Sequence, residues 1–456
     1  MLFGVPGLKK TLSGFFVSIV LTVALVSCGY NSSSKQYAQG SIKLRAFVSN
    51  PVFPNGAGGG AAALEIVDAS RDLLSASVVP LNQVPDAGMM AVSPKRDRTL
   101  TYSPANHALA IVSNAQQAVA STVSLLGPTE SMFVWTDNTT AFVAVPNAAV
   151  AGLPAGAVER IDLANATVTA TIPVPGARFL VPSPSGKQIL VISDSANTVD
   201  LLAPSLIGSG NPLTTIPVAF DKPVWAVFSA DGSTAYVMNC GPECGGTAAS
   251  VSVLDMSPSP AGSHPTVTVT LPVPAASIAL LSGSTSLNPN CRAPKGCLYV
   301  AGTPVALGNC APVQTSASTC GQLTVIDANS MTIKNSGPLP IADGYHNQMA
   351  LGANAQLFIG SRRCTNLNTT SEVRGCLSVI NTTAPIANWC SSTGCPDIIS
   401  PPHNGDVTGI EPIPNRTVVY VCEGGQLKIY DTTTDKLQTT QVSIVGQAID
   451  VKVVDF

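Results

Sequence analysis

Short apolar runs alternate with polar positions along most of this chain, and the same order of runs recurs. In the clearest unit, Asp231-Gly232 separates two apolar runs within residues 228–239. Residues 250–255 and 266–273 follow, and in both segments apolar residues alternate with polar ones. An Asp-Gly pair between apolar runs is typical of a tight hairpin, and such alternation is typical of a half-buried strand. The unit therefore predicts four antiparallel strands in a row.

The unit is repeated through the chain. The copy before it contains residues 183–186, 189–192, 198–202 and 213–218, and a copy with a degenerate first turn lies between residues 84 and 127. The third strand is the most constant part; its other copies are residues 63–68, 158–162, 322–327, 377–381 and 426–431. Four strands repeated about every 40 to 50 residues predict an all-β fold, a β-propeller. We count eight four-stranded antiparallel blades, with seven as the alternative.

The two ends of the repeat region predict how the ring closes. The first unit opens at its second strand, residues 43–49, and the chain finishes on an additional strand, residues 448–456. An open ring would leave unpaired sheet edges, so we expect the C-terminal strand to pair with the first blade. Residues 42–456 are therefore predicted to form one propeller.

The residues of the clearest unit also resemble a known repeat. Ser229-Ala-Asp-Gly232, Ala235-Tyr-Val-Met-Asn239 and Val251-Ser-Val-Leu-Asp255 are similar to the SPDG, YVTN and VxVID segments of YVTN-type propellers, which occur in bacterial surface-layer and lactonase-like proteins. The resemblance is strong over residues 219–273 and weaker over the rest of residues 42–456. It implies a propeller fold and a surface habitat, and it places no catalytic motif on this chain.

The N-terminus has the pattern of a secretion signal. Lys9 and Lys10 precede an uncharged apolar run, residues 11–27, which ends in Leu25-Val-Ser-Cys28. This order resembles a bacterial lipobox, which predicts a signal peptide over residues 1–27, lipidation of Cys28 and a polar tether over residues 28–41. Gly29 after the cysteine favours the outer membrane, on its periplasmic side or at the cell surface. The alternative is an uncleaved membrane anchor, since the run is close to the minimum length for spanning a bilayer.

Ten of the remaining cysteines fall into close pairs, which are Cys240 with Cys244, Cys291 with Cys297, Cys310 with Cys320, Cys364 with Cys376, and Cys390 with Cys395. In an oxidising compartment such spacings predict local disulfides that staple loops. Zinc binding by thiolates is the alternative, although the chain has no CxxC pair and only four histidines. Cys422 is left over in an apolar run, where we expect a buried and unreactive thiol.

The predicted connections between successive blades carry polar residues, and three of the stapled loops fall on the same face. These connection residues are Asp86, Glu130, Arg178, Lys222, Asp343, His346, Asn347, His403, Asn404 and Asp406. We predict a ligand or metal site at the mouth of the central channel from the last six, because imidazole and carboxylate groups bind both metals and polar ligands. The alternative is that they are turn residues facing a wet channel.

Composition limits the functions that remain. The net charge is -3 and the basic residues are scattered, which argues against nucleic acid as a partner. No motif for a cofactor stands out, and we predict none. The favoured function is a membrane-tethered binding or scaffold module of the cell envelope, with a protein or glycan partner at the stapled-loop face. The alternative is a lactonase-like hydrolase that uses the predicted polar or metal site.

Overall fold

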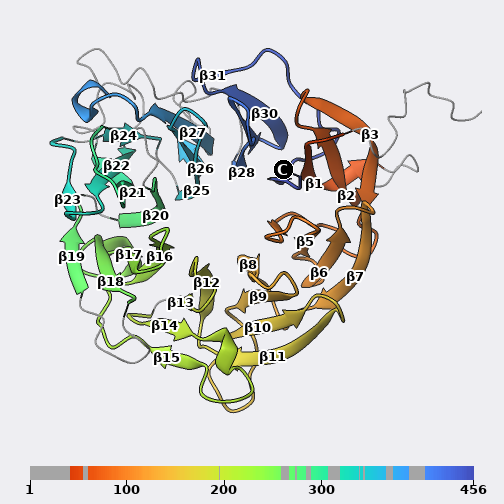
Figure 1. Cartoon of the computed structure of the whole chain (residues 1–456), viewed down its shortest axis with the longest axis horizontal. Coiled ribbons are helices and arrows are strands. Elements are labelled where there is room, and N and C mark those ends of the chain that lie inside the picture. The colour runs from red at the N-terminus through yellow and green to blue at the C-terminus, as the bar shows by residue number, and fades with distance from the viewer. Residues whose placement is uncertain are drawn as a thin grey trace, which may run out of the picture. The chain divides into compact units, whose positions relative to one another are not determined.

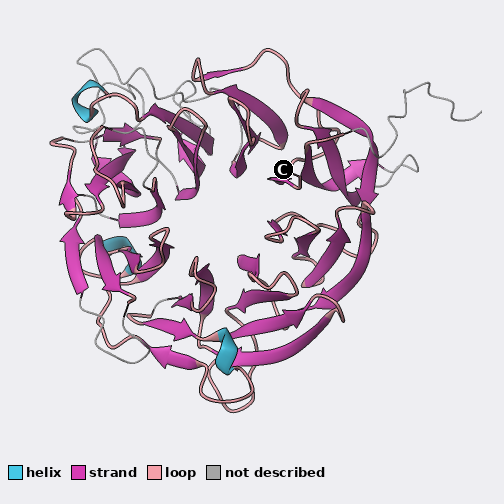
Figure 2. Ribbon diagram, viewed as in Figure 1, coloured by secondary structure: helices cyan, strands magenta, loops and turns pink. Residues whose placement is uncertain are grey.

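The strands expected from the repeats form eight antiparallel sheets that surround a common axis as the blades of a propeller (Figures 1 and 2). The computed structural model describes residues 42–54, 60–194, 196–257, 266–272, 275–283, 289–306, 319–337, 339–342, 345–365, 373–389 and 406–455. Residues 42–456 make one compact unit. The eight-bladed prediction is thus confirmed, and the seven-bladed alternative is wrong.

The blades are numbered here from the one that contains β1, and their strands are given from the innermost outward. Blades 1 to 4 consist of β32 (Asp450–Val453), β1 (Arg45–Pro54), β2 (Gly60–Asp68) and β3 (Leu73–Pro80); β4 (Met90–Val92), β5 (Arg98–Ser103), β6 (Ala108–Ser113) and β7 (Ala118–Ser124); β8 (Ser131–Val134), β9 (Thr140–Val145), β10 (Ala157–Asp162) and β11 (Thr167–Pro173); and β12 (Ala177–Pro182), β13 (Ile189–Ser193), β14 (Val199–Leu202) and β15 (Leu213–Thr215).

Blades 5 to 8 follow the same order, with three strands in blade 7 among the described residues. They consist of β16 (Pro223–Phe228), β17 (Thr234–Asn239), β18 (Ser250–Asp255) and β19 (Thr266–Thr270); β20 (Ala275–Leu281), β21 (Cys297–Ala306), β22 (Thr319–Asp327), β23 (Thr332–Ile333) and β24 (Leu339–Ile341); β25 (Tyr345–Leu351), β26 (Gln356–Thr365) and β27 (Val373–Asn381); and β28 (Val407–Pro412), β29 (Val418–Glu423), β30 (Gln426–Asp431) and β31 (Lys436–Leu437). Blade 6 has a divided outer strand, because β23 and β24 both pair with β22.

In the described part of the chain, short 3-10 helices occupy three connections, η1 (Pro204–Leu206), η2 (Pro242–Cys244) and η4 (Ile386–Asn388). None of the helices in the described ranges has the length and apolar character that a bilayer crossing requires.

The C-terminal strand closes the ring. In blade 1, β32 pairs antiparallel with β1 in a register that places Val451 opposite Val48. The innermost strands of neighbouring blades contact one another around the axis, including β28 with β32 and β32 with β4. The predicted closure is confirmed, although the strand is shorter than the expected residues 448–456.

The core is divided among the interfaces between blades. In β17, Ala235 and Val237 pack in a cluster with blade 4, whereas Tyr236 and Met238 pack in a cluster with blade 6. Side chains of a strand alternate between its two faces, so a sheet covered on both faces needs apolar residues at consecutive positions. This explains why the second strands contain continuous apolar runs, whereas outer strands such as β11 alternate exposed and less exposed positions.

The antiparallel order fixes which connections share a face. All innermost strands run in the same direction, so they all begin at one face of the ring, which we call the entry face. The second strand of each blade ends at this face, and so the second-to-third connections also lie there. The opposite face carries the tight turns after the first strand, including the predicted Asp231-Gly232 turn, in which Gly232 has a φ of 70°. Strands β1, β21 and β26 are each ten residues long, which makes three tall hairpins at the entry face.

Candidate functional site

Arg178 lies at the centre of a charged group on the entry face. It is the second residue of β12, and its Nε and Nη2 lie 3.0 and 2.9 Å from Oε2 of Glu130, which directly precedes β8. Its Nη1 donates to Oδ1 of Asp194 at 2.9 Å. Burial opposes the charge of Arg178, but the hydrogen bonds and charges of Asp194 and Glu130 outweigh burial and raise its pKa. The guanidinium therefore stays positive and is held between two carboxylates.

The side chain of Arg178 also packs against an aromatic ring. The guanidinium carbon lies 5.1 Å from the centre of the Phe179 ring, within the range of a cation–π interaction. Phe179 in turn meets Trp225 of blade 5 edge to face, with 5.5 Å between ring centres. Trp225 donates its indole N–H to the carbonyl of Ala279 in blade 6, at 3.2 Å. The position of the Arg178 head group is thus tied to three consecutive blades.

Tyr345 and Arg362 join the group from blade 7. Tyr345 begins β25 and pairs with Arg362 of β26. Its side chain is 47% exposed. Crowding by surrounding protein atoms raises the pKa of its phenol, and charges on both sides act on it, including those of Arg178 and Glu130. The side chains from blades 3 and 4 and those from blade 7 therefore lie on the same face of the ring, near enough for the charges of Arg178, Glu130 and Asp194 to act on the Tyr345 phenol. We call Glu130, Arg178, Asp194, Tyr345 and Arg362 the Arg178 cluster.

Sequence reasoning found part of this cluster. The sequence predicts that Glu130 and Arg178 lie in the connections, and the structure places them in one ion-pair network. Asp194, Tyr345 and Arg362 were missed. Asp194 directly follows the predicted strand at residues 189–192, and Tyr345 directly precedes His346. Both positions belong to the entry face once the strand order is known, so that order was the signal that could have found them.

His346 is placed differently from the other connection residues. Its side chain is 1% exposed, and its Nε2 lies 2.8 Å from the carbonyl oxygen of Ala342. A carbonyl only accepts hydrogen bonds, so Nε2 carries the proton and Nδ1 is the free acceptor. Burial lowers the pKa of His346 to about 4, and the imidazole is therefore neutral at pH 7. Nδ1 is buried and has no hydrogen-bond partner among the described residues.

The predicted six-residue site is only partly described. Asp343, His403 and Asn404 lie outside the described residues, whereas His346, Asn347 and Asp406 lie within them. Within the described ranges, no three His, Cys, Asp or Glu side chains are arranged to hold a metal ion. The site as a whole stays a prediction.

Two predicted disulfides are present, Cys240–Cys244 and Cys291–Cys297. The first staples the second-to-third connection of blade 5 at the entry face. Cys376 is also disulfide-bonded, to a cysteine whose side chain is not described. Cys422 is free and buried, as predicted. The other predicted disulfide side chains lie outside the described part, namely Cys310, Cys320, Cys364, Cys390 and Cys395. The predicted segments 1–27 and 28–41, with Cys28, also lie outside it.

A second charged group lies on the innermost strands of blades 8 and 1. Lys452 Nζ lies 3.1 Å from Oδ1 of Asp450, whose Oδ2 accepts a hydrogen bond from the main-chain N–H of Met90 at 2.9 Å. Glu411 Oε1 accepts from the N–H of Val453 at 3.0 Å. Burial opposes the charge of Lys452, but Asp450 and Glu411 outweigh it and raise its pKa. These contacts fasten the closing strand β32 to both neighbours, which is a structural role.

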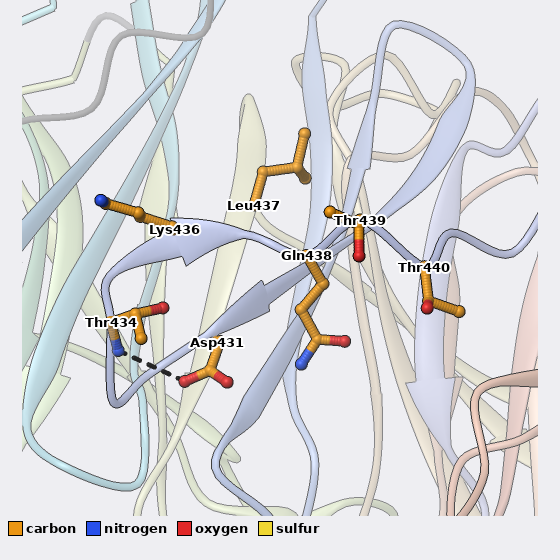
Figure 3. A pocket seen from close by; sticks show the side chains of 7 residues that line it. All are labelled: Asp431, Thr434, Lys436, Leu437, Gln438, Thr439 and Thr440. Atoms are coloured by element: carbon orange, nitrogen blue, oxygen red, sulfur yellow. Dashed lines mark hydrogen bonds between the residues drawn. The ribbon is translucent and has the colours of Figure 1, made fainter.

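A pocket of about 280 Å³ lies at the outer edge of blade 8 (Figure 3). It is lined by Asp431, Thr434, Lys436, Leu437, Gln438, Thr439 and Thr440. The carboxylate of Asp431 accepts hydrogen bonds from the main-chain N–H groups of Thr433 and Thr434, which form the turn into β31. The Asp431 carboxylate thus stabilises a turn. The pocket lies at the outermost strand of blade 8, away from the innermost strands that surround the axis.

Comparison with known proteins adds information on the fold. Neither protein-family models nor curated protein sequences match the chain. Solved structures do match. A dihydro-heme d1 dehydrogenase, NirN, in complex with DHE has a TM-score of 0.60 at 12% identity and covers 92% of this chain and 76% of its own. Hydrazine synthase of Kuenenia stuttgartiensis has a TM-score of 0.54 at 13% identity and covers 80% of this chain and 97% of its own.

A periplasmic gluconolactonase of Pseudomonas aeruginosa, PpgL, also matches, at 14% identity over 90% of this chain and 98% of its own. Its TM-score is 0.48. At these identities the similarities establish that the chain has a β-propeller fold, and they do not identify its ligand.

Proposed function

We propose that this chain is a lipid-anchored binding propeller of the bacterial cell envelope, displayed on the outer membrane. The lipobox-like segment ending at Cys28 supports the anchor. The disulfides Cys240–Cys244 and Cys291–Cys297 support an oxidising compartment, because such bonds are rare where thiols are kept reduced. Propellers are rigid scaffolds whose loops hold ligands, and this chain carries its tallest hairpins and a stapled connection on one face.

The arrangement of the Arg178 cluster carries the binding function. Arg178 bonds to two carboxylates and rests on Phe179, so its donors are fixed before any ligand arrives. A fixed polar array loses little conformational freedom on binding. An arginine does not exchange its proton near neutral pH, so it positions a ligand and does not act as an acid or base.

The lactonase-like alternative lacks comparable support. It needs a metal or a histidine paired with carboxylates, yet His346 donates its Nε2 proton to the carbonyl of Ala342. The remaining residues predicted for such a site include three outside the described ranges. Metal analysis of the purified full-length chain, together with a lactone hydrolysis assay, would test this alternative directly.

Envelope extract passed over the immobilised full-length chain tests the binding function. We expect the wild-type protein to retain a component that the Arg178→Ala variant does not retain. Equal retention by both proteins, or no retention by either, would contradict a binding role for the cluster.

The anchor has a separate test. Cells that express the chain are labelled with radioactive palmitate, and the protein is recovered from membrane and soluble fractions. We expect label in the membrane-bound wild type and none in the Cys28→Ser variant. Equal labelling of the two proteins would overturn lipidation at Cys28.

A further inference from the structure

The hydrogen-bonding capacity of the Arg178 cluster is only partly used within the protein. Each carboxylate bonds Arg178 through one oxygen, Oε2 of Glu130 and Oδ1 of Asp194. The other two carboxylate oxygens have no partner among the described residues, and the two side chains are 59% and 47% exposed. A guanidinium has five N–H donors, of which these contacts engage three. The cluster thus offers fixed donors and acceptors side by side to solvent.

Tyr345 adds an apolar surface to this array. Nearly half of this residue is exposed, which places Tyr345 among the exposed large hydrophobic residues of the described part of the chain. Its hydroxyl makes no hydrogen bond to any part of the chain that the structure describes. The ring therefore presents both an apolar face and a polar tip, a combination that suits a ligand with the same two characters.

The charges of the cluster favour a neutral ligand. Two carboxylates, of Glu130 and Asp194, stand against two guanidinium groups, of Arg178 and Arg362, so the net charge is zero. An anion that accepted from the two unused N–H donors of Arg178 would lie beside the carboxylates of Glu130 and Asp194, whose negative charge would repel it. A cation at the exposed carboxylate oxygens would lie beside the guanidinium of Arg178, whose positive charge would repel it. A neutral ligand meets neither obstacle.

A sugar ring fits these features. Adjacent hydroxyls both donate and accept, so a vicinal pair can bridge a guanidinium N–H and a carboxylate oxygen. One face of many sugar rings consists of C–H groups, which can pack against an aromatic ring. Protein partners are less well matched, because protein interfaces have a core of several buried apolar side chains, and this cluster presents one aromatic ring among four charged groups.

We propose that the Arg178 cluster binds a neutral glycan, with Tyr345 packing against a sugar ring and with Arg178, Glu130 and Asp194 bonding to its hydroxyls. This inference rests on the proposed function of the chain as a binding module. It names the class of ligand for that same site.

The test is isothermal titration calorimetry of the full-length chain in mild detergent. The probes are neutral oligosaccharides, namely maltohexaose, cellohexaose and chitohexaose, followed by an immobilised panel of neutral glycans. We expect at least one neutral glycan to bind. Loss of a hydrogen bond to a charged group weakens binding by roughly tenfold or more, so Arg178→Ala should show at least that loss. Tyr345→Ala should show a similar loss, and Tyr345→Phe should retain most of the affinity.

Two controls keep the result interpretable. Arg71→Ala removes an exposed arginine from the turn between β2 and β3, on the opposite face, and should bind as the wild type does. Unchanged melting temperatures show that the variants are folded. Binding of a neutral ligand should also be nearly independent of salt, because the ligand carries no charge to be screened.

Three results would overturn the inference. These are no binding to any neutral glycan, equal binding by Arg178→Ala and wild type, and a steep loss of affinity with added salt. If the immobilised wild type retains an envelope protein through Arg178 and binds no neutral glycan, this inference fails and the proposed binding function stands. If nothing is retained, both fail.

Discussion

Arg45 and Asp455 lie 410 positions apart in the sequence and form a two-pronged ion pair where the ring closes. Nε and Nη2 of Arg45 lie 2.6 and 2.7 Å from the two carboxylate oxygens, and the Arg45 main-chain N–H donates to the same carboxylate at 3.0 Å. The side chains are only 13% and 21% exposed. Nη1 of Arg45 also donates to the carbonyl of Asn114 in blade 2. The pair therefore joins the end of β32 to the start of β1 and to the next blade.

Removal of either partner should weaken this closure. In Arg45→Ala or Asp455→Ala the remaining charge stays partly buried without its partner, and we expect a loss of about 2 kcal/mol in the free energy of unfolding. Urea denaturation followed by tryptophan fluorescence measures it. The double variant should lose clearly less than the sum of the single losses.

Lys436→Ala is the matched control, because Lys436 lies exposed on the outer strand β31. Its effect should stay within about 0.5 kcal/mol. A double-mutant cycle in which the losses of Arg45→Ala and Asp455→Ala simply add would show that the pair does not stabilise the closed ring.

A second contact across the same closure involves a buried tyrosine. The Tyr420 hydroxyl of β29 donates to Oδ1 of Asp72, and Arg416 bonds both oxygens of the same carboxylate. Asp72 belongs to the turn between β2 and β3, so the group joins blade 8 to blade 1. Tyr420→Phe removes a hydrogen bond to a charged acceptor and should cost about 2 kcal/mol of stability.

Tyr236→Phe provides the comparison. The Tyr236 hydroxyl is also buried and donates to a neutral acceptor, the carbonyl of Ala328, at 3.1 Å. Its loss should cost about 1 kcal/mol, because a bond to a neutral group is weaker. A Tyr420→Phe variant no less stable than Tyr236→Phe would contradict the special role of the charged acceptor.

The fold was predictable because its signals are local and repeated. Each blade needs a tight turn, a second strand buried on both faces and an alternating outer part, and residues 228–273 show all three. The closing strand was predictable because the first unit lacks its innermost strand. The ion pair of Arg45 with Asp455 was not, since a side-chain pairing between the two chain ends leaves no periodic pattern in the sequence.

The site was predictable only in part. Glu130 and Arg178 stand at the starts of innermost strands, which sequence order reveals. Tyr345 lies across the ring from them, in blade 7, and whether their charges act on its phenol depends on the size of the ring, which no local pattern of the sequence gives. The burial of His346 depends on Gly321 of β22, where a Cβ atom would lie 2.7 Å from the imidazole Cε1. Nothing in the sequence around residue 346 reveals this space.

The described disulfides should each contribute modestly to stability. Cys240–Cys244 and Cys291–Cys297 close loops with sequence separations of 4 and 6. For loops this short the chain-entropy model gives about 2 kcal/mol each. We expect Cys291→Ala with Cys297→Ala to lower the urea midpoint accordingly.

Cys422 supplies the internal control for the cysteine chemistry. Its thiol is buried, and burial raises its pKa well above the usual value, so little reactive thiolate forms. Iodoacetamide should leave Cys422 unmodified in the native protein and should modify it after unfolding, as read by mass spectrometry of its peptide. Rapid modification in the native state would contradict the buried position.

Because His346 is buried in its neutral form, the free energy of unfolding should fall in mild acid. Its pKa is lowered by burial from 6.5 to about 4 in the folded protein. Between these two pH values the unfolded chain binds more protons at this position than the folded chain, so stability rises with pH in that window. Above about pH 6.5 the imidazole is neutral in both states, and the full stability is present. As the pH falls from there toward about 4, protonation of the unfolded chain progressively lowers the stability of the folded protein. A shift of this size corresponds to roughly 3 kcal/mol.

His346→Gln tests the assignment, because glutamine can still donate a hydrogen bond toward Ala342 but does not titrate. Urea unfolding at intervals from pH 7.5 to about pH 4 should show a smaller loss of stability for the variant than for the wild type. The carboxylates elsewhere in the chain titrate equally in both proteins, so the difference between the two curves isolates His346. Parallel curves over that range would show that His346 is not buried in its neutral form.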